Sequence, residues 1–317
     1  MTRPHAPSEA LQRYALGLSR ERLPSPAAKD SGQRRARLLR RLKAAGIKGW
    51  PERLTLFTKS LPQGCRPCLR GQGSNLVMTL ECNRDCFFCF NPKPRVPGLS
   101  VHGRSVRTLD EGVALIASLG VRSVGISGGE PLLEERKVLA LVRALRRRLG
   151  PSLRVDLYSN GDLFSIPVLK RLKAAGVSGL RLNLAANGYD AAPAAMALKV
   201  FRDVEVEIPM VPEHKARVLA LLGRLEALGC RHLILHELFA SAANALRMQG
   251  RRALARRAGL TWSGVAGSEE AALEVLLAAL RQGRRLSVYY CSTGTQGWIS
   301  ERALARARAG APKAPKA

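Results

Sequence analysis

Two kinds of hydrophobic pattern alternate through the middle of the chain. Short runs rich in Leu, Val and Ile are followed by longer stretches in which apolar residues recur three or four positions apart. The short runs predict buried strands and the longer stretches predict helices. The expected strands cover residues 75–81, 121–127, 153–159, 178–185, 204–211 and 230–238. The expected helices cover residues 109–119, 132–149, 165–175, 190–200 and 213–228.

This alternation predicts a fold class. Six strands that read as nearly continuous apolar runs, joined by helices and short connections, predict an α/β protein with a parallel sheet and helices outside it. A closed barrel of this type contains eight strand–helix units. We therefore expect a partial (β/α)6 TIM-type barrel over residues 74–238, open on one side, where a large substrate could enter.

The two ends of the chain depart from the rhythm of the barrel. Residues 1–30 predict a loose polar arm, residues 33–45 a basic amphipathic helix, and residues 51–73 a loop. After the barrel we expect helices at 240–258, 268–282 and 300–308, a late strand at 284–292, and a disordered low-complexity tail. The chain thus divides into an N-terminal extension (1–73), the barrel (74–238) and an α-rich C-terminal extension (239–317).

Composition narrows the class of protein. The chain has 317 residues, of which 46% are hydrophobic, which supports a sizeable core and excludes global disorder. No run of 18 apolar residues is present, and the N-terminus lacks the apolar stretch of a secretory signal. A cytoplasmic protein without membrane contact is therefore expected.

The net charge of +28 allows two interpretations. One is a polyanionic partner such as RNA, DNA or an acidic leader peptide. The other is a basic solvated surface, and the spread of the charge along the whole chain favours it. Aromatic residues make up only 5% of the chain, so platforms for stacking bases are not evident.

The cysteines carry the clearest chemical pattern. Seven occur, and five of them lie between residues 65 and 89, which indicates metal binding rather than disulfides in a cytoplasmic chain. Cys82, Cys86 and Cys89 directly follow the first expected strand, where functional sites lie in parallel sheets. Three thiolates in a short loop can ligate three irons of a cubane cluster and leave the fourth iron open. A three-cysteine zinc site completed by a residue such as His102 is the alternative.

A second motif ends the next expected strand, with the sequence Gly128-Gly129-Glu130-Pro131. The glycines let the backbone approach a ligand, and the Glu130 carboxylate can accept hydrogen bonds from an ammonium group. With both motifs present, the chain resembles the radical S-adenosylmethionine (SAM) superfamily, whose signature is Cys-x3-Cys-x-aromatic-Cys. Phe88 fills the aromatic position of that signature.

The resemblance implies cofactors and roles for these residues. The three cysteines of the loop, Cys82, Cys86 and Cys89, would hold a [4Fe-4S] cluster whose open iron binds SAM. The motif that begins at Gly128 would bind the SAM amino group, and Phe88 would lie beside the cofactors.

Polar residues at later strand ends extend the expected SAM site. Ser159 and Asn160, after the third strand, match positions that contact the methionine or ribose part of SAM in this superfamily. Asn183 ends the fourth strand and offers a further polar contact. His214 and His236 also follow or end strands, and we interpret each as a structural histidine rather than as an acid or base that faces a substrate.

A second group of cysteines lies outside the signature. Cys65 and Cys68 form a Cys-x2-Cys pair, and Cys291 lies in the late strand. We expect these three to meet and to bind zinc or an auxiliary iron–sulfur cluster. A redox dithiol, or plain loop cysteines, are the alternatives. Cys230 is expected to be a small buried hydrophobe.

The pair before the loop, the six-unit barrel and the late Tyr-Cys-Ser also resemble, more loosely, proteins related to the activating enzyme of pyruvate formate-lyase. That resemblance implies an enzyme that abstracts hydrogen from a protein or peptide, with electrons from a donor such as flavodoxin or ferredoxin. A radical enzyme that modifies RNA is the first alternative. A non-catalytic, zinc-stabilised nucleic-acid-binding protein is the alternative of another class.

Overall fold

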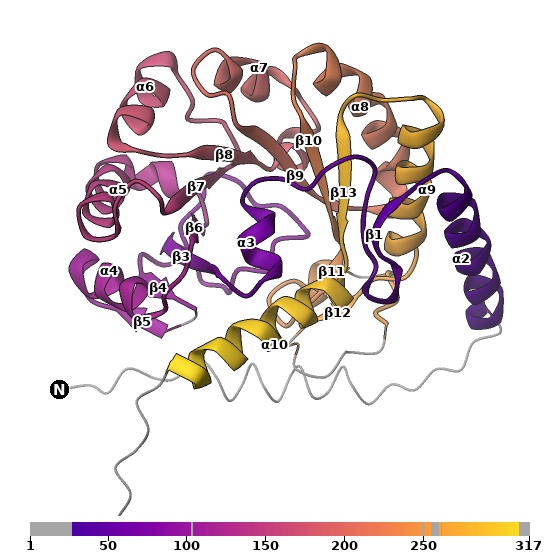
Figure 1. The fold of residues 1–317 in the computed structure, drawn as a ribbon, viewed down its shortest axis with the longest axis horizontal. Helices are drawn as coiled ribbons and strands as arrows, with labels where there is room; N and C mark the ends of the chain where they lie inside the picture. The colour runs from indigo at the N-terminus through magenta and orange to yellow at the C-terminus, as the bar shows by residue number, and fades with distance from the viewer. Residues whose placement is uncertain (1–26, 103, 249, 255–259, 261, 311–317) are drawn as a thin grey trace, which may run out of the picture.

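The centre of the molecule is a curved sheet with helices on its convex side (Figure 1). The structure is a computed structural model that describes residues 27–310, apart from residues 103, 249, 255–259 and 261. The sheet contains 11 strands. Its parallel strands, in spatial order, are β13 (Ser287–Cys291), β10 (His232–Glu237), β9 (Val204–Met210), β8 (Gly179–Leu182), β7 (Arg154–Ser159), β6 (Ser123–Gly128) and β3 (Gly73–Thr79).

Short antiparallel strands extend both sides of this parallel block. β4 (Leu99–Val101) and β5 (Arg104–Val106) follow β3, whereas β2 (Thr55–Phe57) and β1 (Lys48–Trp50) follow β13. β1 and β5 are the two edges of the sheet. In the described part of the chain no hydrogen-bonded pair joins those edges. The prediction of a partial barrel is therefore confirmed, and β13 adds a parallel strand to the six expected ones.

Helices link the parallel strands and cover the outside of the sheet (Figure 1). Those on the outer face are α4 (Leu109–Ser118), α5 (Glu135–Leu149), α6 (Ile166–Ala175), α7 (Ala192–Leu198), α8 (Lys215–Ala227) and α9 (Ser268–Arg281). Before them in the chain, α2 (Ala27–Ala44) packs against α9. Single 3-10 turns connect several elements: η1 (Pro51–Arg53), η2 (Pro131–Glu134), η3 (Leu184–Asn187), η4 (Pro212–His214) and η5 (Ala245–Met248).

The two faces of the sheet differ in chemistry. On β9, Val206 and Ile208 point outward into the main hydrophobic core, while Glu205 and Glu207 point to the concave side. Successive side chains of a strand alternate between faces, so charged residues can line the inside without entering the core. The prediction of nearly continuous apolar strands is wrong here, because the inner face carries a polar network.

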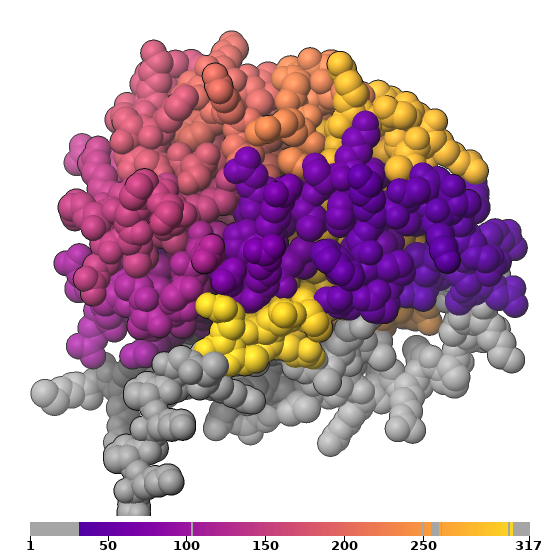
Figure 2. Space-filling model, in the orientation of Figure 1, coloured from indigo at the N-terminus to yellow at the C-terminus, as the bar shows by residue number. Residues whose placement is uncertain are grey.

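The concave side is covered by segments from both ends of the chain. α3 (Cys65–Leu69) lies inside the curve of the sheet, and α10 (Thr293–Gly310) runs across its open side (Figure 1). The indole N–H of Trp298 donates to the carbonyl of Leu69 at 3.3 Å, which joins the two helices. Figure 2 shows the N-terminal segment and α10 side by side over this face. The side expected to be open is therefore largely covered.

Two expectations about the extensions are wrong. Residues 51–73, expected as a loop, contain η1, β2 and α3. Residues 240–258, expected as a helix, contain only the short turn η5 between β11 (Phe239–Ala240) and β12 (Ser263–Gly264), with residues 249 and 255–259 outside the described part. Asn244 explains the second error, because its carboxamide bonds the backbone of Ser241 and Phe239 instead of leaving it to a helix.

The remaining expectations about the two ends of the chain have different outcomes in different segments. Residues 27–30 belong to α2, so the predicted arm is wrong there, while residues 1–26 and the tail 311–317 lie outside the described residues. The late strand is confirmed as β13, and the last expected helix lies within α10. None of the described helices combines the length and hydrophobicity needed to cross a membrane.

Candidate active site

Three of the expected motifs meet at the carboxyl ends of β3, β6 and β7. Glu130, directly after β6, is completely buried. Its carboxylate accepts hydrogen bonds from the Asn160 amide N–H at 2.8 Å and from the Ser159 hydroxyl at 3.0 Å. Burial raises the pKa of Glu130, and these bonds to Asn160 and Ser159 oppose the rise. The predicted residues of the second and third strands therefore form one bonded unit.

Asn83 ties the cysteine loop to that unit. Its side-chain oxygen accepts from the Asn160 carboxamide at 2.7 Å, and its own amide donates to Asp162 at 2.9 Å. Arg84 forms an ion pair with the same Asp162 at 2.5 Å. The sequence analysis did not single out these three residues. Their only signal in the sequence was their position beside Cys82 and after Asn160. That position did not indicate that they bond to one another across the edge of the sheet.

Gly128 and Gly129 bring β6 against the backbone that leads into the cysteine loop. A Cβ atom on Gly129 would lie 1.9 Å from the carbonyl oxygen of Glu81, which no side chain can tolerate. The Gly129 and Glu130 amides instead donate to the carbonyls of Thr79 and Glu81, at 2.7 and 2.8 Å. Glycine is thus required here for close backbone pairing, in addition to its expected role in binding a ligand.

The three loop thiols lie near one another and are partly accessible. All are free, and each is intermediate in exposure. Burial raises the pKa of Cys82, and burial together with the neighbouring thiols of Cys89 and Cys82 raises the pKa of Cys86 to about 11. The bare thiols of Cys82 and Cys86 therefore stay protonated at neutral pH, whereas a bound metal favours the thiolate form.

The C-terminal extension holds the loop from the other side. The guanidinium of Arg247 donates to the Asp85 carboxylate at 2.7 Å and to the Cys86 carbonyl at 3.2 Å. The Asn244 carboxamide donates to the Phe88 carbonyl at 3.1 Å. The Phe88 ring packs against a small apolar cluster that includes Val211 and Leu238. These contacts fix the path of the loop without using the thiols.

Two orphaned oxygens face this edge from the following strand end. Within the described residues, the side-chain oxygens of Asn183 and Asn187 are buried and accept no hydrogen bond. Both residues belong to the turn after β8, and the Asn183 amide donates to the Ser159 carbonyl at 3.0 Å. A buried acceptor without a donor is costly, and a bound molecule carrying N–H or O–H groups would satisfy it.

Comparison with known proteins matches the region of the chain that contains these motifs. The family model described as "Radical SAM superfamily" matches residues 76–232. The chain is a member of the radical SAM superfamily. A protein of Methanocaldococcus jannaschii named as a candidate glycyl-radical enzyme activating enzyme is 26% identical over 228 residues, covering 68% of this chain and 60% of that protein.

Two other similar proteins either match a shorter stretch of the chain or match it at lower identity. A GTP 3',8-cyclase of Synechococcus sp. (strain CC9605) is 35% identical over 124 residues, which cover 37% of this chain and 35% of the cyclase. Coproporphyrinogen III oxidase of Escherichia coli, a solved radical SAM structure, is 14% identical with a TM-score of 0.44, covering 71% of this chain and 57% of that one. The chain therefore spans less than two thirds of these relatives.

The residues present fit the cofactors of the radical SAM superfamily, a [4Fe-4S] cluster and SAM. Three thiols share one loop, and unsatisfied acceptors lie at the neighbouring strand end. No three Cys, His, Asp or Glu side chains of the described chain are gathered as a finished metal site. The fit therefore rests on the type and grouping of the donors rather than on a preformed geometry.

The alternative zinc ligand His102 is separated from the loop. Its ring bonds the Ser74 hydroxyl at 3.1 Å, and Ser74 is the second residue of β3. Cys82 lies beyond the other end of that strand, which has 7 residues and is about 20 Å long. A site that combines His102 with the three loop thiols is therefore excluded by the structure.

The remaining candidates have defined partners. The His214 ring bonds the Tyr189 hydroxyl at 2.9 Å, and Cys230 is buried with its thiol 3.8 Å from the Val204 carbonyl, as expected for structural residues. His236 is bound on both ring nitrogens, to Glu207 and to Gln296. Cys65, Cys68 and Cys291 line one cavity on the concave side, but within the described residues they are not gathered as a metal site.

Proposed function

We propose that this protein is an enzyme that cleaves SAM reductively and uses the resulting radical to abstract hydrogen from a protein or peptide. The observation that carries the proposal is the bonded chain from Glu130 through Asn160 to Asn83, which joins the three motifs at one edge of the sheet. Catalytic sites of parallel α/β folds lie at this edge. The orphaned oxygen of Asn183 adds a place for a ligand there.

Cys82, Cys86 and Cys89 are the proposed ligands of the [4Fe-4S] cluster. A cluster held by these residues would supply the electron needed for the reductive cleavage of SAM. The protein orients the loop through Arg247 and Asn244. The electron comes from outside the chain, and a flavodoxin or ferredoxin is the proposed donor class.

The polar edge is proposed to hold SAM. Asn183 and Asn187 present acceptors that suit the amino and hydroxyl groups of an adenosyl compound. The Glu130 carboxylate orders Ser159 and Asn160, and its negative charge favours the SAM ammonium nearby. Burial of this edge strengthens each such contact relative to water.

The substrate class is inferred from the relatives and from charge. The relative from M. jannaschii is named for the activation of a glycyl-radical enzyme, that is, for action on a protein. The net charge of +28 suits an acidic protein or peptide segment, and an acidic electron donor as well. RNA is the second candidate, because the same charge would attract it.

Anaerobic reconstitution tests the proposed activity. With iron, sulfide, SAM and dithionite, the full chain should become brown and release 5'-deoxyadenosine. Cys86→Ala should abolish the release and Cys230→Ala should preserve it, because only the first removes a proposed ligand. A colourless protein that releases none, or full activity in Cys86→Ala, would overturn the proposal. Competition by acidic peptide or by RNA, measured across a salt series, separates the two substrate classes.

A further inference from the structure

A second group of metal-type side chains lines a cavity of about 280 Å³ on the concave side of the sheet. Cys65 and Cys68 reach it from α3, and Cys291 reaches it from the end of β13. His236 reaches it from β10, where it is the direct register partner of Cys291. Segments from the N-terminal extension, the barrel and the C-terminal extension thus bring four soft or borderline donors to one enclosed space.

The hydrogen bonds of His236 leave one ring nitrogen as an acceptor. Nε2 lies 2.7 Å from a Glu207 carboxylate oxygen, and Nδ1 lies 3.3 Å from the amide nitrogen of Gln296. A carboxylate accepts and an amide N–H donates, so the neutral ring carries its proton on Nε2 and a lone pair on Nδ1. This carboxylate–histidine arrangement is the one that orients histidines bound to zinc.

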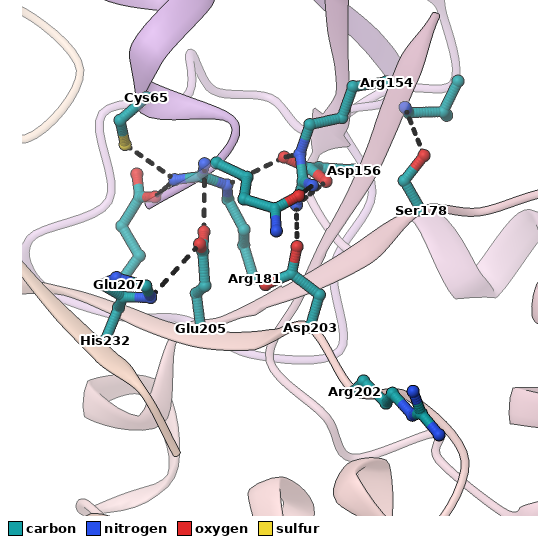
Figure 3. Close-up of polar contacts among 12 residues, drawn as sticks. Cys65, Arg154, Asp156, Ser178, Arg181, Arg202, Asp203, Glu205, Glu207 and His232 are labelled. Atoms are coloured by element: carbon teal, nitrogen blue, oxygen red, sulfur yellow. Dashed lines mark hydrogen bonds and ion pairs between the residues drawn. The ribbon is translucent and has the colours of Figure 1, made fainter. Parts of the chain in front are cut away.

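A charged donor is also directed at one of the sulfur atoms. The Arg181 guanidinium, which is 4% exposed, donates to the Cys65 sulfur at 3.4 Å (Figure 3). Tyr289 and Cys291 lie two residues apart on β13 and line the same cavity. N–H and O–H donors aimed at sulfur are typical of thiolate centres, because they offset the charge on the ligands.

Charge balance agrees with a divalent ion at this place. Zn²⁺ with three thiolates and a neutral imidazole keeps one net negative charge, and binding releases the three thiol protons to solvent. Arg181 lies directly beside that charge. Its other partners are Asp156, Glu205 and Glu207, so the guanidinium is already fixed in position by ion pairs (Figure 3).

We propose that Cys65, Cys68, Cys291 and Nδ1 of His236 bind one Zn²⁺ ion in a closed tetrahedral site. Three thiolates and one imidazole are a ligand set of structural zinc, and the set leaves no open position. The site is separate from the cysteine loop, because Cys68 packs against Gly73 at the start of β3 and Cys82 follows its far end.

The four donors line the cavity without converging on one point, as no finished metal site exists among the described residues. The loop cysteines share that property. Three of the four donors are cysteines, which reach new positions by rotation about one bond. Zinc would therefore draw α3 onto the ends of β10 and β13, and would fix the segment that covers the open side of the sheet.

Metal content tests the site independently of SAM cleavage. The full chain, purified before iron reconstitution, should contain about one zinc per chain, as a closed site requires. Cys65→Ser and Cys291→Ser should each reduce that content at least tenfold. His236→Ala should weaken retention against a chelator. The matched controls are Cys230→Ser, another buried cysteine, and His232→Gln, on the same face of β10; both should keep the zinc.

A second measurement does not depend on the folding of those variants. In a chain whose three loop cysteines are replaced by alanine, Co²⁺ should give the visible absorption of tetrahedral thiolate coordination, and Zn²⁺ should displace it. An octahedral cobalt spectrum, or wild-type protein without zinc, would overturn the proposal. Zinc retained in Cys65→Ser would overturn the ligand set. If Cys65→Ser loses iron instead of zinc, the proposed identity of the metal is wrong.

Discussion

The two cysteine groups of this protein use the same side chain in opposite surroundings. Cys82, Cys86 and Cys89 lie on a partly exposed loop beyond the strand ends, held by backbone contacts that leave the thiols free. Cys65 and Cys291 are buried on the inner side of the sheet, and the Arg181 guanidinium is directed at the Cys65 sulfur. The difference indicates what each group can do. An accessible group can admit a cofactor and a substrate, whereas an enclosed group can only hold segments of the chain together.

The supports of the two groups differ as well. The loop is positioned by neutral side chains and by ion pairs, those of Arg84 with Asp162 and of Asp85 with Lys93, Arg95 and Arg247. The buried group adjoins four carboxylates and two guanidinium groups of the described inner face, from Asp156, Asp203, Glu205, Glu207, Arg154 and Arg181. Changes near the loop should therefore affect chemistry, and changes near the buried group should affect stability.

The largest effect should follow a change in the loop itself. Cys89→Ala should reduce 5'-deoxyadenosine release to background, because a proposed ligand of the cluster is lost. Its free energy of unfolding should change by less than about 0.5 kcal/mol, as for other partly exposed sites. Product assays and urea denaturation measure the two quantities. If Cys89→Ala loses stability as well as product, the loop cysteines do not differ from the buried cysteines in the way described.

Glu205 offers a pH-dependent test of the buried network. Burial raises the pKa of Glu205 to about 7, although Arg181 opposes the rise. The folded state then holds this proton from about pH 4.5 to 7 after the unfolded chain has lost it, so stability falls as pH rises through that window. Glu205→Gln removes this titration.

The measurement is the difference in unfolding free energy between the two proteins across the pH range. Relative to Glu205→Gln, the wild type should lose about 3 kcal/mol between pH 4.5 and 7 and little more above it. A constant difference across this range would show that Glu205 does not titrate as described. SAM cleavage by the variant should stay near the wild-type rate, because Glu205 lies outside the proposed SAM site.

Gly64, the residue directly before α3, tests how tightly this segment approaches the same network. A Cβ atom on Gly64 would lie 2.3 Å from an Asp156 oxygen and 2.4 Å from an Arg181 nitrogen. Gly64→Ala should therefore cost about 2 kcal/mol of stability by overpacking. Gly98→Ala is the matched control, since nothing lies within 4 Å of its Cβ position. Equal midpoints of the two variants in urea would contradict the close approach.

The smallest effect is expected at the polar edge near the loop. Asn183→Leu removes an acceptor that no described group satisfies, so stability should hold or rise slightly. SAM binding should weaken about tenfold if the acceptor bonds the cofactor, a change of about 1.4 kcal/mol. Equilibrium dialysis with the reconstituted protein measures it. Unchanged SAM affinity would remove Asn183 from the proposed site.

Much of the barrel was predictable because its outer face follows simple periodicities. The parallel strands β3 and β6 to β10 and the helices that connect β6 to β10 lie where the apolar runs indicated, within a few residues, whereas β4 and β5 were not predicted. The motifs at Cys82 and Glu130 are local in sequence, so their placement at strand ends could be read directly. The link between them could not, since it depends on Asn83 meeting Asn160 across the edge.

The remaining predictions failed because they depend on contacts that a short stretch of sequence does not reveal. The segment 240–258 is rich in helix formers, yet Asn244 bonds the local backbone and the cysteine loop in place of a helix. The inner charges of β9 alternate with core residues, a pattern visible in VEVEI, but their partner Arg181 comes from another strand. Tertiary contacts, rather than local propensity, decided both outcomes.

The position of β13 late in the sequence determines the order in which parts of this fold can form. β2, near the start of the described chain, pairs antiparallel with β13, which ends at Cys291. During synthesis β2 can pair with β1 at once, but its pairing with β13 must wait until β13 has left the ribosome. The barrel strands can form earlier, because each pairs with its neighbour in sequence. The N-terminal extension is therefore synthesised before β13 and completes its pairing with the sheet only afterwards, in a step set by long-range contacts.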